Sequence, residues 1–516
     1  MNEHSFVASQ TGPGLPESFD FNTDIWHNAS TLDSDFSWPF VDSMFDSVTT
    51  TCDSQEASGG HPTSNLPSAS DELFDTFFNS PGQTRSDHAT SPASSADFGR
   101  SALVEQFLGS DVPPILSTVE IGPRWTTTKM LLTTLANSST MVRSAMMAFS
   151  ALSVQPTDQP TRTEHRALYD RAARDYTAFC KQAQNSGEDG RPGLKHALAT
   201  AFFLAYSDLL TNRIREAQAV LKDAAAILGF CKSKRWSAVE RRLISWLRLV
   251  DGRASSAGAD GAFLAETDKA AYTPATETET GSKSDRAPGE TSTPSETTIE
   301  EVLFDVLYSP GLLFYQRVQS IMARVSAIDP WHRRRGTVTD ETEVMALASA
   351  ISGDLHELER QRPALMDHAV EGALTERLVA KDISLSITRS YRVYWANYQA
   401  SHIHLHRVAY KHLPATAEVT EARRVIKRMA QLLRQSGEQL PVNFIWPLLM
   451  ASCEEDNLQD RIWMLEAIRG MHGQASNARP VAAVLEEVLA RQDAIKQRVD
   501  VRQTSMDLYK LSFAVV

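Results

Sequence analysis

Apolar residues recur at helical spacing through most of the chain beyond about residue 101. Ile214, Ala217, Leu221, Ala224 and Leu228 fall on one stripe, as the buried face of an amphipathic helix requires. The same spacing predicts helices over 141–152, 164–180, 194–210, 214–228 with Gly229 as the stop, 237–250, 301–328, 341–360, 375–410, 421–435 ending at Gly437, and 480–498. No segment alternates as a half-buried strand would. The pattern therefore predicts an all-α fold, either a multi-helix bundle or an irregular helical array.

Two segments lack this pattern. Residues 1–100 are rich in Ser, Thr, Asp, Gly and Pro, so they can bury too little apolar surface to offset the entropy of the chain. Residues 267–298 have a similar composition and almost no apolar side chains. We expect both to be disordered, the second as an insertion within a helical domain that spans 101–516.

The segment 444–461 combines an apolar run with a closing group of acids. Pro447 can open a short buried helix, because a proline is tolerated in the first helical position. The next helix is expected to start at Asp456 or Asn457, with Gln459 as a capping-box partner of Asp456, and to stop near Gly473. Its apolar stripe is predicted to comprise Leu458, Ile462, Leu465 and Ile468.

Five stretches, in this order, resemble the fungal-specific transcription factor domain, the helical middle homology region that follows a zinc binuclear cluster in many fungal regulators. They are 142–152 (VRSAMMAFSAL), 194–228, 243–256 (LISWLRLVDGRASS), 394–407 (YWANYQASHIHLHR) and 444–461. The resemblance covers roughly residues 100 to 516. It implies a helical regulatory domain and control of pathway genes, including clusters for secondary metabolites.

Acidic residues are concentrated at the N-terminal end of the chain. Residues 1–110 contain sixteen acidic and two basic residues, a net charge of −14, whereas the whole chain carries −13. Aromatic and apolar side chains are interleaved with these acids, which is typical of an acidic activation segment that docks as short induced helices in a partner's apolar groove. The predicted anchors are Phe19, Phe21, Trp26, Phe36, Trp38, Phe40, Phe45, Leu73, Phe74, Phe77 and Phe78. The alternative is a tail that only keeps the protein soluble.

The four cysteines, at positions 52, 180, 231 and 453, are too widely spaced for a zinc or redox motif, and we expect free thiols in a reducing compartment. Residues 1–10 contain Glu3 and lack the apolar core of a secretory signal. No apolar run reaches the roughly 18 residues that a membrane span needs. We expect an intracellular protein that acts in the nucleus.

Candidate chemical groups are better explained as structural. Glu454 and Glu455 point about 100° apart on a helix, so they are expected to cap a helix or pair with an arginine such as Arg461. His402 and His406 share a helical face, but they lack the further ligands that a zinc site needs. We therefore expect structural or surface roles for the three histidines of this stretch, His402, His404 and His406. His356 begins a string similar to HExxH in which Arg360 replaces the second histidine.

No phosphate-binding loop, dinucleotide fingerprint or nucleophile elbow is found, so we expect no enzyme, no cofactor and no metal. Four cysteines cannot form the six-cysteine cluster that reads DNA in this family. Basic residues do occur in runs, at 232–235, 241–242, 333–335, 423–424 and 427–428. We expect these runs to be solvated helix faces rather than phosphate contacts.

The expected function is transcriptional regulation in a fungus, in which the acidic segment recruits coactivators and the helical domain represses, dimerises or senses a small molecule. Direct DNA contact is unproven on this view, and the partners are coactivators together with a zinc-cluster protein or a second copy of the chain. The main alternative is an adaptor that does not bind DNA and reaches promoters through a zinc-cluster partner. A third is that a zinc cluster precedes Met1 in a longer gene.

Overall fold

The computed structural model describes residues 107, 113–153, 159–186, 193–230, 236–258, 261, 263, 299–330, 333, 335–471, 475–510, 512 and 514–516. Within these ranges the chain forms sixteen α-helices and two short 3-10 helices, without strands, so the predicted all-α fold is confirmed. The two segments for which we expect disorder, 1–100 and 267–298, lie outside the described residues.

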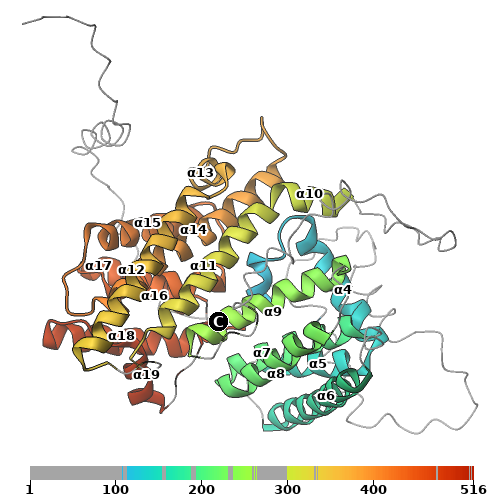
Figure 1. Ribbon diagram of the computed structural model, residues 1–516. Coiled ribbons are helices and arrows are strands. Elements are labelled where there is room, and N and C mark those ends of the chain that lie inside the picture. The colour runs from blue at the N-terminus through green and yellow to red at the C-terminus, as the bar shows by residue number, and fades with distance from the viewer. Residues whose placement is uncertain are drawn as a thin grey trace, which may run out of the picture. The chain divides into compact units, whose positions relative to one another are not determined.

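Two groups of helices are joined where α9 packs against α11 (Figure 1). The first group comprises η1 (Pro114–Thr118), α4 (Pro123–Ser138), α5 (Thr140–Ser153), α6 (Gln159–Ser186), α7 (Leu194–Leu210), α8 (Ile214–Phe230) and α9 (Ala238–Ser256). The second comprises α10 (Ile299–Leu307), α11 (Ser309–Ala327), α12 (Val338–Arg360), α13 (Ala364–Val370), α14 (Lys381–Ala409), α15 (Ala417–Gln435), η4 (Val442–Phe444), α16 (Ile445–Cys453), α17 (Leu458–Arg469), α18 (Ala478–Ile495) and α19 (Val501–Tyr509).

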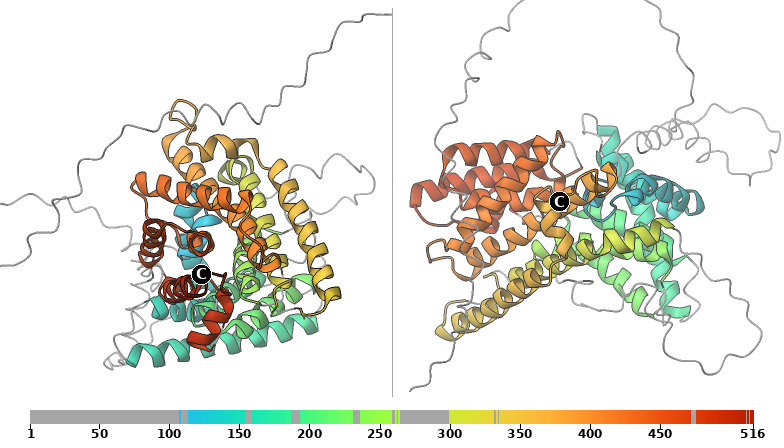
Figure 2. Two further views of the ribbon diagram at one scale, coloured as in Figure 1. Left: turned by 90° about the vertical axis from the view of Figure 1, so that its left-hand side faces the viewer. Right: turned by 90° about the horizontal axis from the view of Figure 1, so that it is seen from above.

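Each group is built around one central helix. Helix α7 contacts α4, α5, α6, α8 and α9, and almost all of its residues are buried. A helix that is apolar all round is expected at the centre of a large core. Helix α14 contacts α11, α12, α13, α15 and α16 in the same manner. In the right-hand view of Figure 2, the orange and red helices gather on one side and the cyan and green ones on the other.

Buried polar side chains connect the two groups. The Asn443 side chain accepts a hydrogen bond from Arg253 (2.8 Å) and donates one to the carbonyl of Ile115 (3.0 Å). The same Arg253 donates to the Tyr315 hydroxyl at 3.0 Å. Since all these polar groups lie in the core, each needs the others as partners, and η1, α9, α11 and η4 are fixed relative to one another.

A buried carboxylate fixes the turn between η1 and α4. Glu120 is 1% exposed and accepts hydrogen bonds from the indole of Trp246 at 2.6 Å, from Arg242 and from Thr128 at 3.2 Å. Because a buried carboxylate is stable only with such donors, this cluster holds α9 against the start of α4.

Several helix ends differ from their predicted positions. The predicted helix 301–328 forms two helices that break at Tyr308, because Pro310 lacks the N–H that a helix interior needs and is tolerated in the first turn of α11. Gly229 does not stop α8, which ends at Phe230, and α14 begins at Lys381 rather than at 375. Helix α16 starts at Ile445, two residues before the proline expected to open it.

Helix α17 corrects three further predictions. Its cap is Asn457, whose side chain accepts from the backbone N–H groups of Gln459 (2.9 Å) and Asp460 (3.2 Å), so the capping box predicted for Asp456 is wrong. The helix ends at Arg469 instead of near 473. Leu458 and Ile462 are 63% and 45% exposed. The inner face instead carries polar residues that pair with neighbouring helices, followed by Met464, Ala467 and Ile468.

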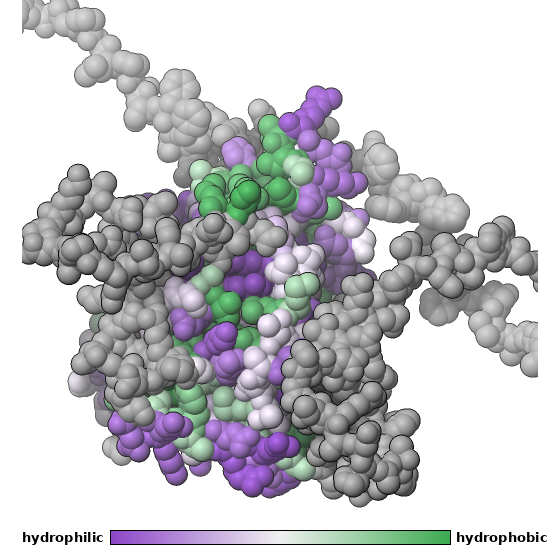
Figure 3. Space-filling model, turned by 90° about the vertical axis from the view of Figure 1, so that its right-hand side faces the viewer, coloured by the Kyte–Doolittle hydropathy of each residue, from purple (hydrophilic) through white to green (hydrophobic). Residues whose placement is uncertain are grey.

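Helix α10 has an exposed apolar face. Phe304 is buried beneath the guanidinium of Arg124, which lies 3.3 Å from the ring centre. Figure 3, which shows the right-hand side of the view in Figure 1, has apolar side chains gathered at its upper edge. The exposed apolar side chains of α10 are Ile299, Val302, Leu303 and Val306.

Within the part of the chain that the structure describes, no helix is long and apolar enough to cross a membrane.

Candidate functional site

The activation-segment anchors predicted from the sequence, Phe19 to Phe45 and Leu73 to Phe78, all lie outside the described residues. The paired acids and the histidines singled out in the sequence lie in the second group of helices. There, side chains from α14, α16 and the segment before α19 surround one carboxylate and one cavity.

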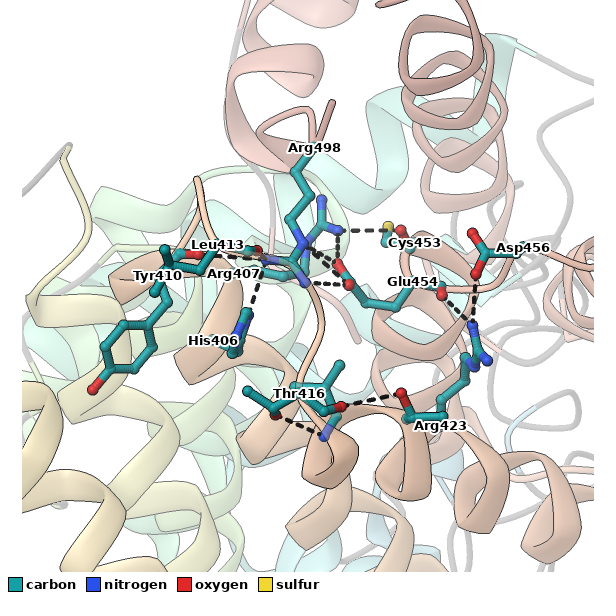
Figure 4. A network of polar contacts seen from close by, with 12 residues as sticks. His406, Arg407, Tyr410, Leu413, Thr416, Arg423, Cys453, Glu454, Asp456 and Arg498 are labelled. Carbon is teal, nitrogen blue, oxygen red and sulfur yellow. Dashed lines mark hydrogen bonds and ion pairs between the residues drawn. The ribbon is translucent and has the colours of Figure 1, made fainter. Parts of the chain in front are cut away.

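Glu454 is the centre of this arrangement. It follows α16, its side chain is 5% exposed, and it faces Arg407 of α14 and Arg498 of the 496–500 turn. Arg498 donates to both carboxylate oxygens, with Nε–Oε1 at 2.9 Å and Nη2–Oε2 at 2.6 Å, and Arg407 donates to Oε1. Figure 4 shows both guanidinium groups pointing toward the carboxylate of Glu454. Two buried positive charges therefore share one buried negative charge.

Neither arginine depends on Glu454 alone. Arg407 also donates to the carbonyl of Val499 at 2.7 Å and to the side chain of Gln492 at 3.2 Å. Arg498 donates to the carbonyl of Leu413 at 2.8 Å. These bonds join α14, α16, α18 and the turn before α19. The network therefore holds these four segments in fixed positions around Glu454.

The adjacent carboxylate, Glu455, caps the turn that follows α16. Its Oε1 accepts from the backbone N–H groups of Asp456 and Asn457, both at 3.0 Å, and its Oε2 lies 3.4 Å from Arg423. The expectation that the paired acids cap a turn and pair with arginines is confirmed by these contacts. Only the partner differs, because Arg461 binds the backbone carbonyl of Glu455 and no carboxylate of the pair.

The three histidines of α14 have different surroundings. His402 is buried and lies 2.9 Å from a carboxylate oxygen of Glu418, and its hydrogen bond is the main cause of the lowered pKa of that carboxyl. The His406 Nδ1 lies 2.9 Å from Arg498, and burial followed by that charge lowers the pKa of His406. All three are buried, as a structural role requires, and the surface alternative is wrong. Among the described residues, no group of three or more His, Cys, Asp and Glu side chains could hold a metal ion.

His404 differs from its neighbours because its Nδ1 has no hydrogen-bond partner among the described residues. It is 8% exposed, and its ring packs edge-on against Trp446 with 5.0 Å between ring centres. Within the described part of the chain, its Nδ1 and the Nε1 of Trp446 have no hydrogen-bond partner. Burial, and then the charge of Arg407, lowers the pKa of His404 to about 3, so the imidazole is neutral at pH 7.

A cavity of about 280 Å³ lies beside the Glu454 network. It is lined by the C-terminal ends of α9, α11 and α14, by α16, α18 and α19, and by residues 512 and 515. His404, Trp446, Arg407 and Arg498 all belong to its lining. Sequence periodicity gave no signal for it, because its walls come from segments that are far apart in the chain.

The buried thiols provide no nucleophile. Cys180 and Cys453 are free and buried, and burial raises the pKa of each thiol to about 11. A thiol is nucleophilic only as the thiolate, which is scarce at neutral pH at such a pKa. The other two cysteines, Cys52 and Cys231, lie outside the described residues.

Most of the described residues of the basic runs form intramolecular ion pairs. Arg335 contacts Glu341 at 2.6 Å and is 8% exposed, and Lys427 contacts Asp460 at 2.5 Å. Others pair in the same way: Arg242 with Glu120, Arg423 with Glu455, Arg424 with Glu421, and Arg428 with Glu371. The prediction of purely solvated faces is thus wrong for Arg242, Arg335 and Arg423, whose side chains are 20% exposed or less. The run 232–235 lies outside the described residues.

A family model described as the fungal specific transcription factor domain matches residues 126–508. The matched range contains the Glu454 network and most of the residues that line the cavity. No curated protein and no solved structure matches the chain.

Proposed function

Because the chain belongs to the family of the fungal-specific transcription factor domain, it is a transcriptional regulator, and we propose that it activates pathway genes in the nucleus through its acidic N-terminal segment. The helical domain sets when this segment acts. The expected targets are genes of a biosynthetic pathway, such as a cluster for a secondary metabolite.

One observation carries the activation proposal. The segment 1–110 combines a net charge of −14 with aromatic and apolar anchors placed between the acids. Acids keep such anchors solvated until an apolar groove of a coactivator accepts them. A tail that serves only solubility does not need these aromatic residues.

A reporter assay tests the proposal. Residues 1–110 are fused to an unrelated DNA-binding module, and reporter output is compared with that of the module alone. Replacing Phe74, Phe77 and Phe78 with alanine should remove much of the activation, whereas replacing Thr76, Asn79 and Ser80 should not. If the fusion gives no output above the module alone, the activation segment is refuted.

The second candidate function is that of an adaptor that reaches promoters through a DNA-binding partner. The ion pairs of the basic runs favour it, because Arg335, Arg423 and Lys427 would have to leave carboxylates in order to bind phosphates. On this view the partner is a zinc-cluster protein or, in a symmetric assembly, a second copy that recruits one.

Titration against genomic DNA at two salt concentrations separates the two functions. Direct binding driven by phosphate contacts weakens steeply as salt rises, whereas an adaptor shows little binding at either concentration. Coprecipitation from nuclear extract should then recover a DNA-binding protein if the adaptor function holds. Transcript profiling after deletion of the gene identifies the pathway, and unchanged transcripts would contradict regulation of that pathway.

A further inference from the structure

We infer that the cavity beside the Glu454 network binds a small organic anion, with an apolar body against the helices and one anionic group at the basic rim. This deepens the proposed regulatory role, because such a molecule is the effector that the helical domain would sense. Binding is a property of the purified chain, so it can fail while the activation by residues 1–110 stands.

The apolar part of the site is formed by two helices and the C-terminal tail. The lining residues Trp446, Leu449 and Met450 come from α16, Val481 and Val484 from α18, and Val515 from the tail. These side chains give a ligand an apolar surface to bury. At about 280 Å³ the cavity is near the small end of ligand sites, which typically span roughly 300–1,000 Å³. It therefore suits a short-chain or single-ring molecule.

Two polar atoms at this apolar wall are without partners. The Nδ1 of His404 and the Nε1 of Trp446 belong to residues that are 8% and 7% exposed, and neither has a hydrogen-bond partner among the described residues. Buried polar groups in native proteins are nearly always satisfied, so such atoms call for an explanation. Both nitrogens lie just behind the cavity surface, so a small rotation of either ring would bring its nitrogen to a polar atom of a bound molecule. The neutral imidazole has one donor and one acceptor nitrogen, and the indole only donates.

The charge of the lining selects an anion over a cation. Four cationic side chains, Arg407, Lys411, Arg498 and Arg502, line the cavity, against the two carboxylates Asp329 and Asp500. Glu454, which pairs with both Arg407 and Arg498, neutralises one further positive charge. The site remains net positive by one charge after all three carboxylates are counted. Lys411 is exposed and approaches an anionic group most readily, whereas the half-buried Arg502 already donates to the carbonyl of Ala257 at 3.1 Å and can only share itself with the ligand.

The binding test uses the purified full-length chain and three probes that share one apolar chain: octanoate, 1-octanol and octylammonium. Isothermal titration calorimetry should show saturable binding of octanoate to a single site. Octylammonium should bind roughly tenfold more weakly or not at all, since it brings a positive charge to a net positive site. Equal affinity for octanoate and octylammonium would overturn the choice of an anion, and failure of octanoate to bind would overturn the site.

Variants locate the binding to this cavity. Arg502→Gln and the exposed Lys411→Gln should each weaken octanoate by up to roughly tenfold while leaving octanol nearly unchanged. Val499→Phe adds volume at the half-buried lining residue of the 496–500 turn and should weaken both probes. Arg424→Gln, which changes an exposed arginine on α15, is the matched control and should leave both affinities unchanged. The site is refuted if the affinity for octanoate is unchanged in all three variants, Lys411→Gln, Arg502→Gln and Val499→Phe.

Discussion

Replacing Glu454 with glutamine removes one negative charge from between two buried arginines and leaves the volume of the side chain nearly unchanged. The side chains of Arg407 and Arg498 are 8% and 14% exposed, so water cannot readily take over from the lost carboxylate. The amide of the new glutamine would place a donor group against guanidinium groups that only donate. Two like charges would then face each other without their shared counterion.

The expected loss of stability is large for one substitution. Breaking a buried ion pair by removing one partner destabilises a protein by about 3–5 kcal/mol, because the remaining charge stays buried and uncompensated. Arg407 keeps its hydrogen bond to the carbonyl of Val499, and Arg498 keeps its bond to the carbonyl of Leu413. The expected loss therefore stays within this range. Domains as a whole are stable by about 5–15 kcal/mol, so the variant should unfold several degrees below the parent.

Urea unfolding followed by far-ultraviolet circular dichroism measures this loss for the full-length chain. The matched control is Glu421→Gln, which breaks a pair with Arg424 whose two side chains are 50% and 55% exposed. Exposed pairs contribute about 0–1 kcal/mol, so the control should unfold close to the parent. If Glu454→Gln shifts the midpoint no more than the control does, the account of Glu454 as a shared buried counterion is wrong.

Three further predictions follow from single positions. Burial raises the pKa of Asp208 to about 6, so the native state holds a proton that the unfolded state releases near pH 4. The free energy of unfolding should therefore fall by at most roughly 3 kcal/mol as the pH rises from 4 to 6.5. Melting curves of Asp208→Asn should lack this dependence on pH. Gly311→Ala should destabilise the protein by about 1–3 kcal/mol, because its new methyl group would lie 1.8 Å from the ring of Tyr391. In the same thermal assay Gly353→Ala, which lies in open space on α12, should stabilise the protein by about 0.5–1 kcal/mol. Ser237→Ala removes the cap of α9 and should lower the unfolding free energy by about 1 kcal/mol, and an unchanged value would contradict the role of that cap.

The helices that the sequence predicts best are those with an uninterrupted apolar pattern. Helix α7 runs over the predicted residues, because its apolar positions extend without a break from Leu194 to Leu210. Helix α4 was not predicted, since its threonines dilute the pattern. In the structure several of these hydroxyls donate to carbonyls one turn earlier, as Thr133 does to Lys129 at 2.9 Å. Helices α13 and α19 were missed because each is short.

The candidate site was only half visible in the sequence. Glu454 drew attention through its place at the end of an apolar run, but its partners lie 47 and 44 residues away, at Arg407 and Arg498. Periodicity reports which face of an element is buried and carries no information on which distant charge meets it. The same reason hides the cavity, whose lining runs from residue 256 to residue 515.

Deletion mapping of this protein has to be interpreted with the Glu454 network in mind. A truncation that ends between residues 454 and 497 keeps Glu454 and Arg407 but discards Arg498, together with the Val499 carbonyl that Arg407 contacts. Loss of activity in such a series would report collapse of the surrounding helices, even if the discarded residues have no regulatory task themselves. Point substitutions at exposed positions can therefore locate a regulatory element in this region where progressive shortening cannot.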